Sequence, residues 1–415
     1  MDYRIADPLL YTEGERKLRW AWQHMDVLKS LRDLHIKEAP LKGETIAACL
    51  HLEAKTACLL KVMQDLGAKV VAAGSNPLST QDDVCAALVK AGVHVFSRRG
   101  MSNEEYTDNL EELVRFRPTI VIDDGADLIA LIHEKHQSLI PSIKGGCEET
   151  TTGISRLLAM ANDGVLSFPV IAVNDAKSKF LFDNRYGTGQ SVMDGIMRTT
   201  NLLLAGKKVV VAGYGWCGRG VAMRANAMGA RVIVVETDPH RAFEAMMDGY
   251  EVTSMLEASS KGDIFLTLTG NTRVIRKEHF ERMHDGVLLA NAGHFDVEID
   301  RNNLEELATN IDPIRENIET YVMKDGRKLH LLAMGRLVNL AAGDGHPVEI
   351  MDLSFGIQLL SALYISRHNS ELPAGVLPLP EDLDQEVMKI KLRSLNVELE
   401  SMTPEQEAYI SSWKE

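Results

Sequence analysis

The chain has 415 residues, of which 45% are hydrophobic and 25% are charged, the composition of an ordinary globular protein. That length exceeds what one hydrophobic core usually organises, so two or three domains are expected. The formal charge of −14 argues against a nucleic-acid or anionic-membrane partner, because either would need a basic face. A locally positive pocket for a phosphate is compatible with that charge.

The sequence also predicts the compartment. No apolar run approaches the roughly 20 residues of a membrane span, and the N-terminus lacks the pattern of a signal peptide. The five cysteines are odd in number, form no C-x-x-C pair and lie among apolar or small residues. Such cysteines are typical of reduced thiols, so we expect a cytoplasmic protein without a metal site.

From about residue 45 the chain alternates short β-rich runs with runs of helical period, which predicts a parallel α/β layer. The β-rich runs are found in KVVAAG (69–74), VHVF (93–96), TIVID (119–123) and PVIAV (169–173). A helical pattern over 184–207 then leads to a second α/β series. Its β-rich runs are KKVVVAG (207–213), RVIVVE (231–236), DIFLTLTG (263–270), GVLLANAG (286–293) and HLLAMG (330–335).

The C-terminal part has a different pattern. Residues 345–368 predict a long amphipathic helix with no strand after it, which we interpret as a return to the first domain. The last segment, TPEQEAYISSWKE, predicts a helix that begins at Thr403-Pro404.

Gly213, Gly215 and Gly218 form a G-x-G-x-x-G fingerprint between an apolar strand and a helix. Gly213 allows the tight turn, Gly215 lets the backbone approach a pyrophosphate, and Gly218 allows close packing of helix and strand. The next strand ends in Glu236, 23 residues after Gly213. A carboxylate there accepts ribose hydroxyls and repels a 2′-phosphate, so the sequence predicts NAD rather than NADP.

Nine blocks resemble the S-adenosylhomocysteine hydrolases, from near one end of the chain to near the other. They are LHLEAKTA (50–57), NPLSTQDD (76–83), IDDGAD (122–127), EETTTG (148–153), VNDAKSKFLFDN (173–184), VAGYGWCGRG (211–220), NAGHFDVEID (291–300), GRLVNL (335–340) and GHP (345–347).

The resemblance implies an α/β protein in which a Rossmann NAD-binding domain is inserted into a second α/β domain that binds substrate. The expected division is 1–186 and 345–385 for the substrate domain, 187–344 for the NAD domain and 386–415 for a small helical tail. A homotetramer with one NAD per subunit, retained during turnover, is implied as well. Longer family members end in a Lys/Tyr-bearing tail that reaches a neighbour's NAD site; this chain resembles the shorter archaeal and thermophilic form.

The resemblance also implies a reaction. A thioether on C5′ of a ribose is a poor target for direct hydrolysis. Oxidation of the 3′-hydroxyl by NAD gives a ketone that acidifies the C4′–H bond, so homocysteine can leave, water can add and the ketone can be reduced again. We therefore expect reversible hydrolysis of an S-nucleosyl-L-homocysteine to L-homocysteine and a nucleoside, in S-adenosylmethionine recycling and one-carbon metabolism.

Site residues follow from the same resemblance, whereas each one taken singly has an ordinary structural explanation. Lys179 and Asp183 match the residues at the 3′-hydroxyl, and a lysine acts there as a base only if its pKa is lowered. The other substrate and catalytic residues implied are Glu149 at the 2′-hydroxyl, Asp124 and His51 near C4′ and C5′, His294 near the ribose and His346 at the hinge by the purine. The cofactor contacts implied are Thr150, Thr151, Thr152, Asn184, Asn271, His294, Asn339 and His346.

Glu53 and Lys55 occupy the segment that reads the purine in the family. Lys55 could donate to O6 of hypoxanthine while Glu53 accepts N1–H, or Glu53 could accept N6–H of adenine while Lys55 donates to N1. The two side chains could also pair only with each other. The segment, together with GYGWCGRG and FDNRYGTGQS, resembles the methanogen-type S-inosylhomocysteine hydrolases, so we expect the inosyl substrate to be used at least as well as the adenosyl one.

An NAD-dependent dehydrogenase with net substrate oxidation is the alternative function. Glycine-turn domains beside a split second domain also occur among 2-hydroxy-acid dehydrogenases. Such an enzyme would release NADH in bulk, whereas the hydrolase releases a free thiol without net NADH.

Overall fold

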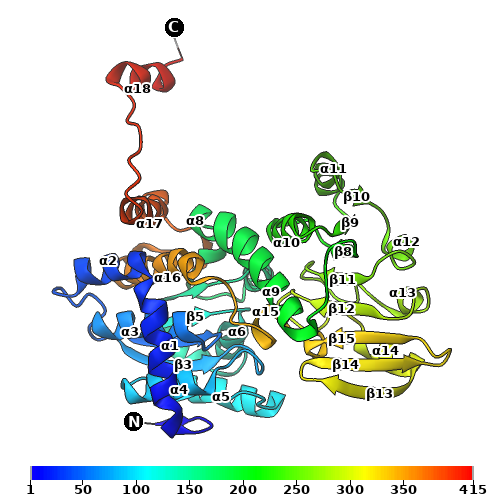
Figure 1. The fold of residues 1–415 in the computed structure, drawn as a ribbon. Helices are drawn as coiled ribbons and strands as arrows, with labels where there is room; N and C mark the ends of the chain where they lie inside the picture. The colour runs from blue at the N-terminus through cyan, green and yellow to red at the C-terminus, as the bar shows by residue number, and fades with distance from the viewer. Residues whose placement is uncertain (1, 414–415) are drawn as a thin grey trace.

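The computed structural model describes residues 2–413, which fold into two α/β lobes (Figure 1). Each lobe is built on an eight-stranded sheet. In β2 (Thr45–Leu50), Ile46 belongs to one hydrophobic cluster and Ala47 to another, on the opposite face of the sheet. Burial on both faces explains why the β-rich runs are continuously apolar, and it confirms the α/β class.

The first sheet is wholly parallel, with the strand order β1-β4-β3-β2-β5-β6-β7-β16. Besides β2 its strands are β1 (Tyr3–Arg4), β3 (Lys69–Gly74), β4 (His94–Phe96), β5 (Ile120–Asp123), β6 (Gly145–Glu148), β7 (Pro169–Ala172) and β16 (Gly375–Leu377). Its N-terminal helices are α1 (Tyr11–Gln23), α2 (Asp26–His35), α3 (Ala54–Asp65), α4 (Asp82–Lys90), α5 (Asn103–Arg115), α6 (Asp127–Lys135) and α7 (Thr151–Asn162). The first four pack on one face and α5–α7 on the other.

A nearly continuous helical segment connects the lobes, as predicted. It consists of α8 (Lys177–Lys179), the π-helical η4 (Phe180–Gly187) and α9 (Thr188–Thr200).

The second sheet has the order β10-β9-β8-β11-β12-β15-β14-β13, and only the β13–β14 and β14–β15 pairs are antiparallel. Its strands are β8 (Lys208–Ala212), β9 (Arg231–Val235), β10 (Glu251–Val252), β11 (Ile264–Thr267), β12 (Val287–Asn291), β13 (Ala308–Arg315), β14 (Ile318–Met323) and β15 (Lys328–Leu332). Its helices are α10 (Trp216–Ala227), α11 (Pro239–Met247), α12 (Met255–Ala258), α13 (Lys277–Phe280), α14 (Arg301–Leu307) and α15 (Val338–Ala341). The predicted β-rich runs are all present, and the hairpin of β13 and β14 was not predicted.

The helix α16 (Val348–His368) returns the chain to the first lobe, where its side chains are buried on nearly every side. The expectation of an amphipathic helix is therefore wrong. By length and composition α16 could span a membrane, but 72% of its most apolar window is buried in the protein, as in a core helix. The expectation that no strand follows is also wrong, because β16 pairs with β7. Three residues between prolines are too short to show a strand period.

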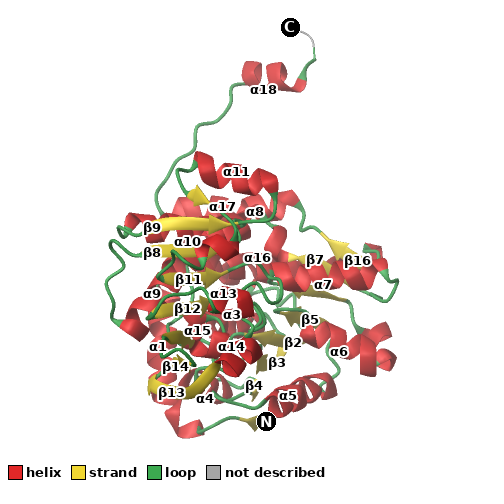
Figure 2. Cartoon of the chain, turned by 90° about the vertical axis from the view of Figure 1, so that its right-hand side faces the viewer, coloured by secondary structure: helices red, strands yellow, loops and turns green. Residues whose placement is uncertain are grey.

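The C-terminal segment leaves the body of the molecule (Figures 1 and 2). The helix α17 (Glu381–Ser394), which was not predicted, packs on α2 and α16 and spans the expected limit at residue 385. The last helix, α18 (Pro404–Ser411), begins where predicted. Thr403 Oγ1 accepts the Gln406 N–H at 3.2 Å, and Gln406 Oε1 accepts the Thr403 N–H at 2.8 Å. No side chain of α18 is buried.

Candidate active site

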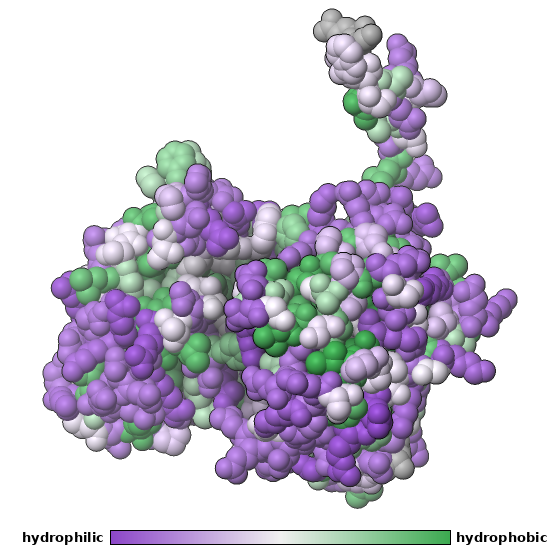
Figure 3. All heavy atoms as spheres, turned by 180° about the vertical axis from the view of Figure 1, so that it is seen from behind, coloured by the Kyte–Doolittle hydropathy of each residue, from purple (hydrophilic) through white to green (hydrophobic). Residues whose placement is uncertain are grey.

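Both lobes line one cavity of about 1060 Å³, and a furrow separates the lobes on the face shown in Figure 3. All the residues predicted for the site line this cavity except Gly218. In the first lobe His51 follows β2, Asp124 follows β5 and Glu149 follows β6. Parallel strands end at a common edge, which is where α/β sheets bind ligands, so the topology brings these distant residues together.

Lys179 is the buried cation of the cavity. Its Nζ lies 3.1 Å from Asp183 Oδ2 and 3.7 Å from Glu149 Oε1, and it donates to Asn184 Oδ1 at 2.8 Å. Lys179 ends α8 and Asp183 lies in the π-helical turn that follows. This irregular turn places both side chains in the cavity, a use common for π-helical insertions at functional sites.

The pKa of Lys179 is raised, so the condition for its action as a base is not met by the protein alone. Burial lowers the pKa of Lys179, but the Asp183 and Glu149 carboxylates outweigh it, and the net pKa lies above its usual value. Burial likewise opposes ionisation of Asp183, but Lys179 and His346 hold the pKa of Asp183 below its usual range. Both pKa shifts favour an ammonium–carboxylate pair over a neutral lysine.

Glu149 has an unused acceptor. Gln358 Nε2 donates to Glu149 Oε2 at 2.5 Å, whereas the buried Oε1 has no hydrogen-bond partner. Burial raises the pKa of Glu149 to about 8, against the attraction of Lys179. A buried oxygen that accepts no hydrogen bond and has only the Lys179 ammonium 3.7 Å away fits a hydroxyl donor from a ligand.

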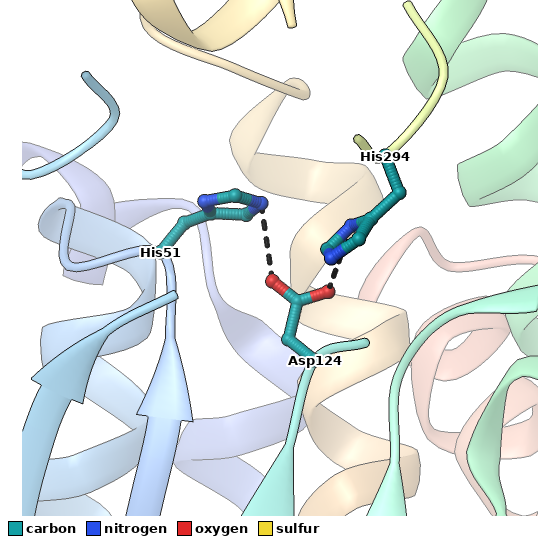
Figure 4. A group of neighbouring side chains, drawn as sticks. All are labelled: His51, Asp124 and His294. Carbon is teal, nitrogen blue, oxygen red and sulfur yellow. Dashed lines mark ion pairs between the residues drawn. The ribbon is translucent and has the colours of Figure 1, made fainter. Parts of the chain in front are cut away.

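Asp124 lies between two imidazoles, one from each lobe (Figure 4). Its Oδ2 is 3.1 Å from His51 Nε2 and accepts the Ser75 hydroxyl at 2.7 Å, and its Oδ1 is 3.7 Å from His294 Nδ1. Burial opposes ionisation of Asp124, but both histidines favour it, and the net pKa lies below its usual value. Burial lowers the pKa of His51, whose Nδ1 lies 2.7 Å from Ser79 Oγ. A carboxylate base and a proton-carrying imidazole are thus in contact.

His346, expected beside the purine, is turned toward Asp183. Its Nδ1 contacts Asp183 Oδ1, and its Nε2 lies 3.3 Å from Thr188 Oγ1. Ser354 Oγ donates to the other Asp183 oxygen at 2.9 Å. Both nitrogens of the His346 ring are therefore engaged within the protein.

The glycine turn has the geometry that a dinucleotide needs. Gly213 has a φ of +98°, which favours glycine. A Cβ on Gly218 would lie 1.9 Å from the Gly213 carbonyl oxygen, so the strand and helix touch there, which also explains why Gly218 does not line the cavity. A Cβ on Gly215 would approach no protein atom closer than 3.9 Å, so its open side is free for a phosphate at the start of α10.

Two further groups fit the predicted cofactor. Glu236 Oε2 accepts the Tyr214 N–H at 2.7 Å, which holds the carboxylate beside the glycine turn. Asn339 Nδ2 donates to Ser191 Oγ at 3.2 Å, and the buried Asn339 Oδ1 has no hydrogen-bond partner. An acceptor left in this way suits a carboxamide N–H, such as that of a nicotinamide. The residues present therefore fit NAD.

The three threonines and Asn271 differ in their freedom to bind. Thr150 caps α7, because its hydroxyl accepts the Gly153 N–H at 3.0 Å and donates to Glu148 Oε1 at 2.8 Å. Thr152 Oγ1 lies 3.7 Å from the position of a Cβ on Gly270, so it faces the second lobe across the cavity. Thr151 and Asn271 are exposed at the rim.

Glu53 and Lys55 pair with each other, but not only with each other. Lys55 Nζ lies 2.8 Å from Glu53 Oε2 and donates to the Asp344 carbonyl at 2.6 Å. Glu53 also caps α3, where its carboxylate accepts the N–H groups of Lys55 and Thr56. The acceptor sites of Glu53 are thus largely used, whereas Lys55 keeps one N–H for a ligand in the cavity.

Several supporting residues were not predicted from the sequence. Ser354 and Gln358 lie one turn apart on one face of α16, and that helical spacing of polar residues in an apolar run was a readable signal. Asn174 accepts from Lys179 at 3.4 Å and from Asn184 at 3.0 Å. No local pattern distinguishes it from a turn residue.

The fold and the cavity together define a two-domain enzyme that binds a dinucleotide on one sheet and a second small molecule at the edge of another. The family model "S-adenosyl-L-homocysteine hydrolase" matches residues 2–138, and "S-adenosyl-L-homocysteine hydrolase, NAD binding domain" matches residues 184–345. The chain belongs to the S-adenosyl-L-homocysteine hydrolase family. The predicted NAD cofactor and the predicted hydrolase of an S-nucleosyl-L-homocysteine are confirmed at this level.

Curated relatives match over the whole length. The chain is 56% identical to the adenosylhomocysteinase of Thermococcus kodakarensis over 413 residues, covering 100% of this chain and 98% of that protein. It is 54% identical to the S-inosyl-L-homocysteine hydrolase of Methanopyrus kandleri over 415 residues, with 100% and 98% covered. It is 53% identical to the S-inosyl-L-homocysteine hydrolase of Methanocaldococcus jannaschii over 413 residues, with 100% and 99% covered. The chain is thus about equally similar to the adenosylhomocysteinase and to the two S-inosyl-L-homocysteine hydrolases, so the purine preference depends on the residues of the site.

Proposed function

We propose that this chain catalyses the reversible hydrolysis of S-inosyl-L-homocysteine to L-homocysteine and inosine. It hydrolyses S-adenosyl-L-homocysteine to L-homocysteine and adenosine no more efficiently. One observation carries the proposal. The Lys179–Asp183–Glu149 cluster beside the glycine turn and the His51–Asp124–His294 group lie on a single cavity. A site for hydride exchange and a site for proton transfer can therefore act on two neighbouring carbons of one ribose.

The first cluster holds the ribose hydroxyls in this proposal. Glu149 Oε1, which lacks a partner, accepts the 2′-hydroxyl, and Asp183 and Lys179 contact the 3′-hydroxyl. Bound NAD would supply the hydride acceptor and donor for the 3′-carbon. Lys179 must first lose a proton to act as a base, and a further positive charge in the cavity would lower its pKa toward that state.

The second group handles protons at C4′ and C5′. Asp124 is ionised and buried, so it can accept the C4′ proton once a neighbouring ketone has acidified that bond. His51 lies against Asp124 with its other nitrogen at Ser79, an arrangement that suits proton delivery to the leaving thiolate and proton removal from the entering water. His294 completes the group from the NAD-binding lobe.

The purine preference rests on Lys55. Because Glu53 is occupied by the α3 backbone and by Lys55, the group free to face a ligand is a lysine N–H donor. Hypoxanthine offers the O6 acceptor to such a donor. Adenine offers N1 to the lysine but also presents an N6–H donor, for which Glu53 has little acceptor capacity left. A mismatch of this kind is able to impose large discrimination.

The test is a thiol-release assay on both purified thioethers, with bound NAD measured after denaturing extraction. We expect kcat/KM for the inosyl substrate to equal or exceed that for the adenosyl substrate. An adenosyl preference of about 100-fold or more would overturn the purine assignment, since a polar mismatch reaches this size. Bulk NADH without free thiol would overturn the reaction itself.

The cofactor contacts, the domain limits and the assembly are further parts of the proposal. The contacts to NAD are assigned to the glycine turn, to Glu236 and to the remaining cavity residues Thr150, Thr151, Thr152, Asn184, Asn271, His294, Asn339 and His346. The substrate domain is assigned to 1–186 and 345–385, the NAD domain to 187–344 and the tail to 386–415. A cytoplasmic homotetramer that retains one NAD per subunit is the assembly proposed.

A further inference from the structure

Three side chains of the types that can ligate a metal ion converge where the two lobes meet (Figure 4). The ligand atoms of His51, Asp124 and His294 all lie within 4.8 Å of one another. They form the one group of this kind among residues 2–413. The absence of a metal site was expected because the cysteines lack zinc spacing, but this group comes from three distant segments, so no spacing announces it.

Two of the three separations are close to those of a tetrahedral site, and the third, between the two imidazoles, is no more than 4.8 Å. Zn²⁺ binds imidazole and carboxylate at about 2.0–2.2 Å, so two of its ligand atoms lie about 3.3 Å apart. His51 Nε2 and Asp124 Oδ2 are 3.1 Å apart, and His294 Nδ1 and Asp124 Oδ1 are 3.7 Å apart. A movement of His294 by up to about 1.5 Å toward His51 and Asp124 brings all three ligand atoms to that value.

An outer layer of hydrogen bonds already orients the ligands. Ser79 Oγ lies 2.7 Å from His51 Nδ1, so the Nε2 atom is the one directed at Asp124. Ser75 donates to Asp124 at 2.7 Å and fixes the carboxylate. Such outer partners fix the ring orientation and tautomer in protein metal sites.

The charge distribution favours a cation between these groups. A carboxylate faces a ring nitrogen on each side, and only a proton or a metal ion between them removes the repulsion of their lone pairs. The three protein ligands leave the fourth tetrahedral position toward the cavity, the arrangement of a zinc site that binds an exogenous ligand.

We propose that this chain binds one thiophilic divalent cation, such as Zn²⁺ or Co²⁺, at His51, Asp124 and His294, and that the thiolate of homocysteine completes the coordination. Zinc and cobalt accept thiolate readily. The bound cation occupies the groups that transfer protons and ties the two lobes together, so it inhibits turnover and retains the product. The cation site rests on geometry alone, whereas the thiolate ligand rests on the proposed function, which directs the leaving sulfur to this end of the cavity.

The test is titration of the NAD-loaded enzyme with Co²⁺, whose visible absorption is strong in a tetrahedral site and weak in water. We expect one tetrahedral Co²⁺ per subunit, and a sulfur-to-cobalt band when homocysteine is added but not when homoserine is added. Equilibrium dialysis, which measures the Co²⁺ retained with the protein, shows that the tetrahedral Co²⁺ is protein-bound. His294→Asn should weaken Co²⁺ binding by more than about 100-fold, because outer-shell partners alone are worth about 10–100-fold.

Two matched variants exclude other sites. His240→Asn removes an exposed histidine, with a side chain 97% accessible, and Cys217→Ser removes the one thiol that lines the cavity among the residues described. Neither should change the cobalt spectrum. A six-coordinate spectrum, indifference to His294→Asn, or loss of the band in Cys217→Ser would overturn the cation site. Cobalt binding without a homocysteine band would overturn only the thiolate ligand, and a failed hydrolysis assay with intact cobalt binding would overturn only the proposed function.

Discussion

Individual side chains in the cavity are arranged so that few buried charges are left over. Lys179 pairs with Asp183, and burial raises the pKa of Glu149 to about 8, which opposes a second buried negative charge beside the lysine. Breaking such a pair strands a buried charge, which costs about 3–5 kcal/mol. The effect of a substitution here should therefore be measured on the separate steps, NADH formation and thiol release, as well as on overall activity.

Lys179→Ala and Asp124→Asn should separate the two halves of the reaction. The first removes the cation at the ribose hydroxyls, so we expect no NADH absorbance when substrate is added. The second keeps that cluster but removes the base, so NADH should form while thiol release slows by about 10²–10⁴-fold, the usual worth of a general base. Stopped-flow absorbance and a thiol reagent measure the two steps. Near-normal thiol release in both variants would contradict the assignment of roles.

Glu149 should make stability depend on pH. Its pKa is about 8 in the folded chain, where burial raises it, and about 4.3 when unfolded. The folded state thus binds this proton more tightly, so the stabilisation is complete at pH values below the unfolded pKa and is lost as the pH rises through 8. Glu149→Gln does not ionise, and its free energy of unfolding should fall less than that of the wild type between pH 5 and 9 in denaturant titrations. Equal slopes in the two proteins would contradict the shifted pKa.

At the scale of elements, α16 supports the site from the far end of the chain. Asp352 on this helix accepts the N–H groups of Val27 and Leu28 at 3.0 Å each and so caps α2, while Ser354 and Gln358 reach the carboxylates of the cavity. Each of these three side chains makes at least one hydrogen bond, which offsets part of the cost of burying polar groups in so apolar a helix.

Gln358→Ala should impair catalysis through Glu149. The carboxyl loses its donor, and the loss of about 1 kcal/mol corresponds to roughly fivefold in kcat/KM. Ser361 is the matched control, because it is buried on the same helix and its hydroxyl has no hydrogen-bond partner. Ser361→Ala should leave kcat/KM unchanged. Equal kinetic effects of the two substitutions would show that the defect lies in the packing of the helix.

The glycine turn allows a similar contrast. Gly215→Ala adds a methyl group in open space, so the NAD-free protein should keep its melting temperature while NAD binding is lost. Gly218→Ala forces a Cβ onto the Gly213 carbonyl oxygen and should lower the melting temperature of the NAD-free protein by about 1–2 °C, as a loss of about 1–2 kcal/mol does in a chain of this size. Thermal melting and extraction of bound NAD measure both. Full NAD content in Gly215→Ala would argue against the phosphate position.

For the whole molecule, the tail is the segment that the lobes do not explain. Residues 395–413 bury no side chain, although several of them are apolar. Leu395, Leu399 and Ile410 are 60%, 65% and 66% exposed. Apolar groups on so extended a segment suit burial against another subunit.

Removal of residues 395–415 should therefore change assembly rather than folding. We expect near-UV circular dichroism like that of the full chain, because no core contact is lost. The mass from light scattering should fall below that of the proposed homotetramer of 45.9 kDa chains. A tetramer that persists after truncation would place the subunit contacts elsewhere.

The features that the sequence alone determined are local ones. The α/β class, the glycine turn, Glu236 after the second strand and the cap at Thr403 depend on residues close together in the chain, so periodicity and spacing reveal them. Only the tertiary structure decided the direction of the Lys179 pKa shift, the partners of His346, the short strand β16 and the distances among His51, Asp124 and His294. The physical reason is that pKa values and coordination depend on distances across the cavity, which the fold sets and which no interval along the chain records.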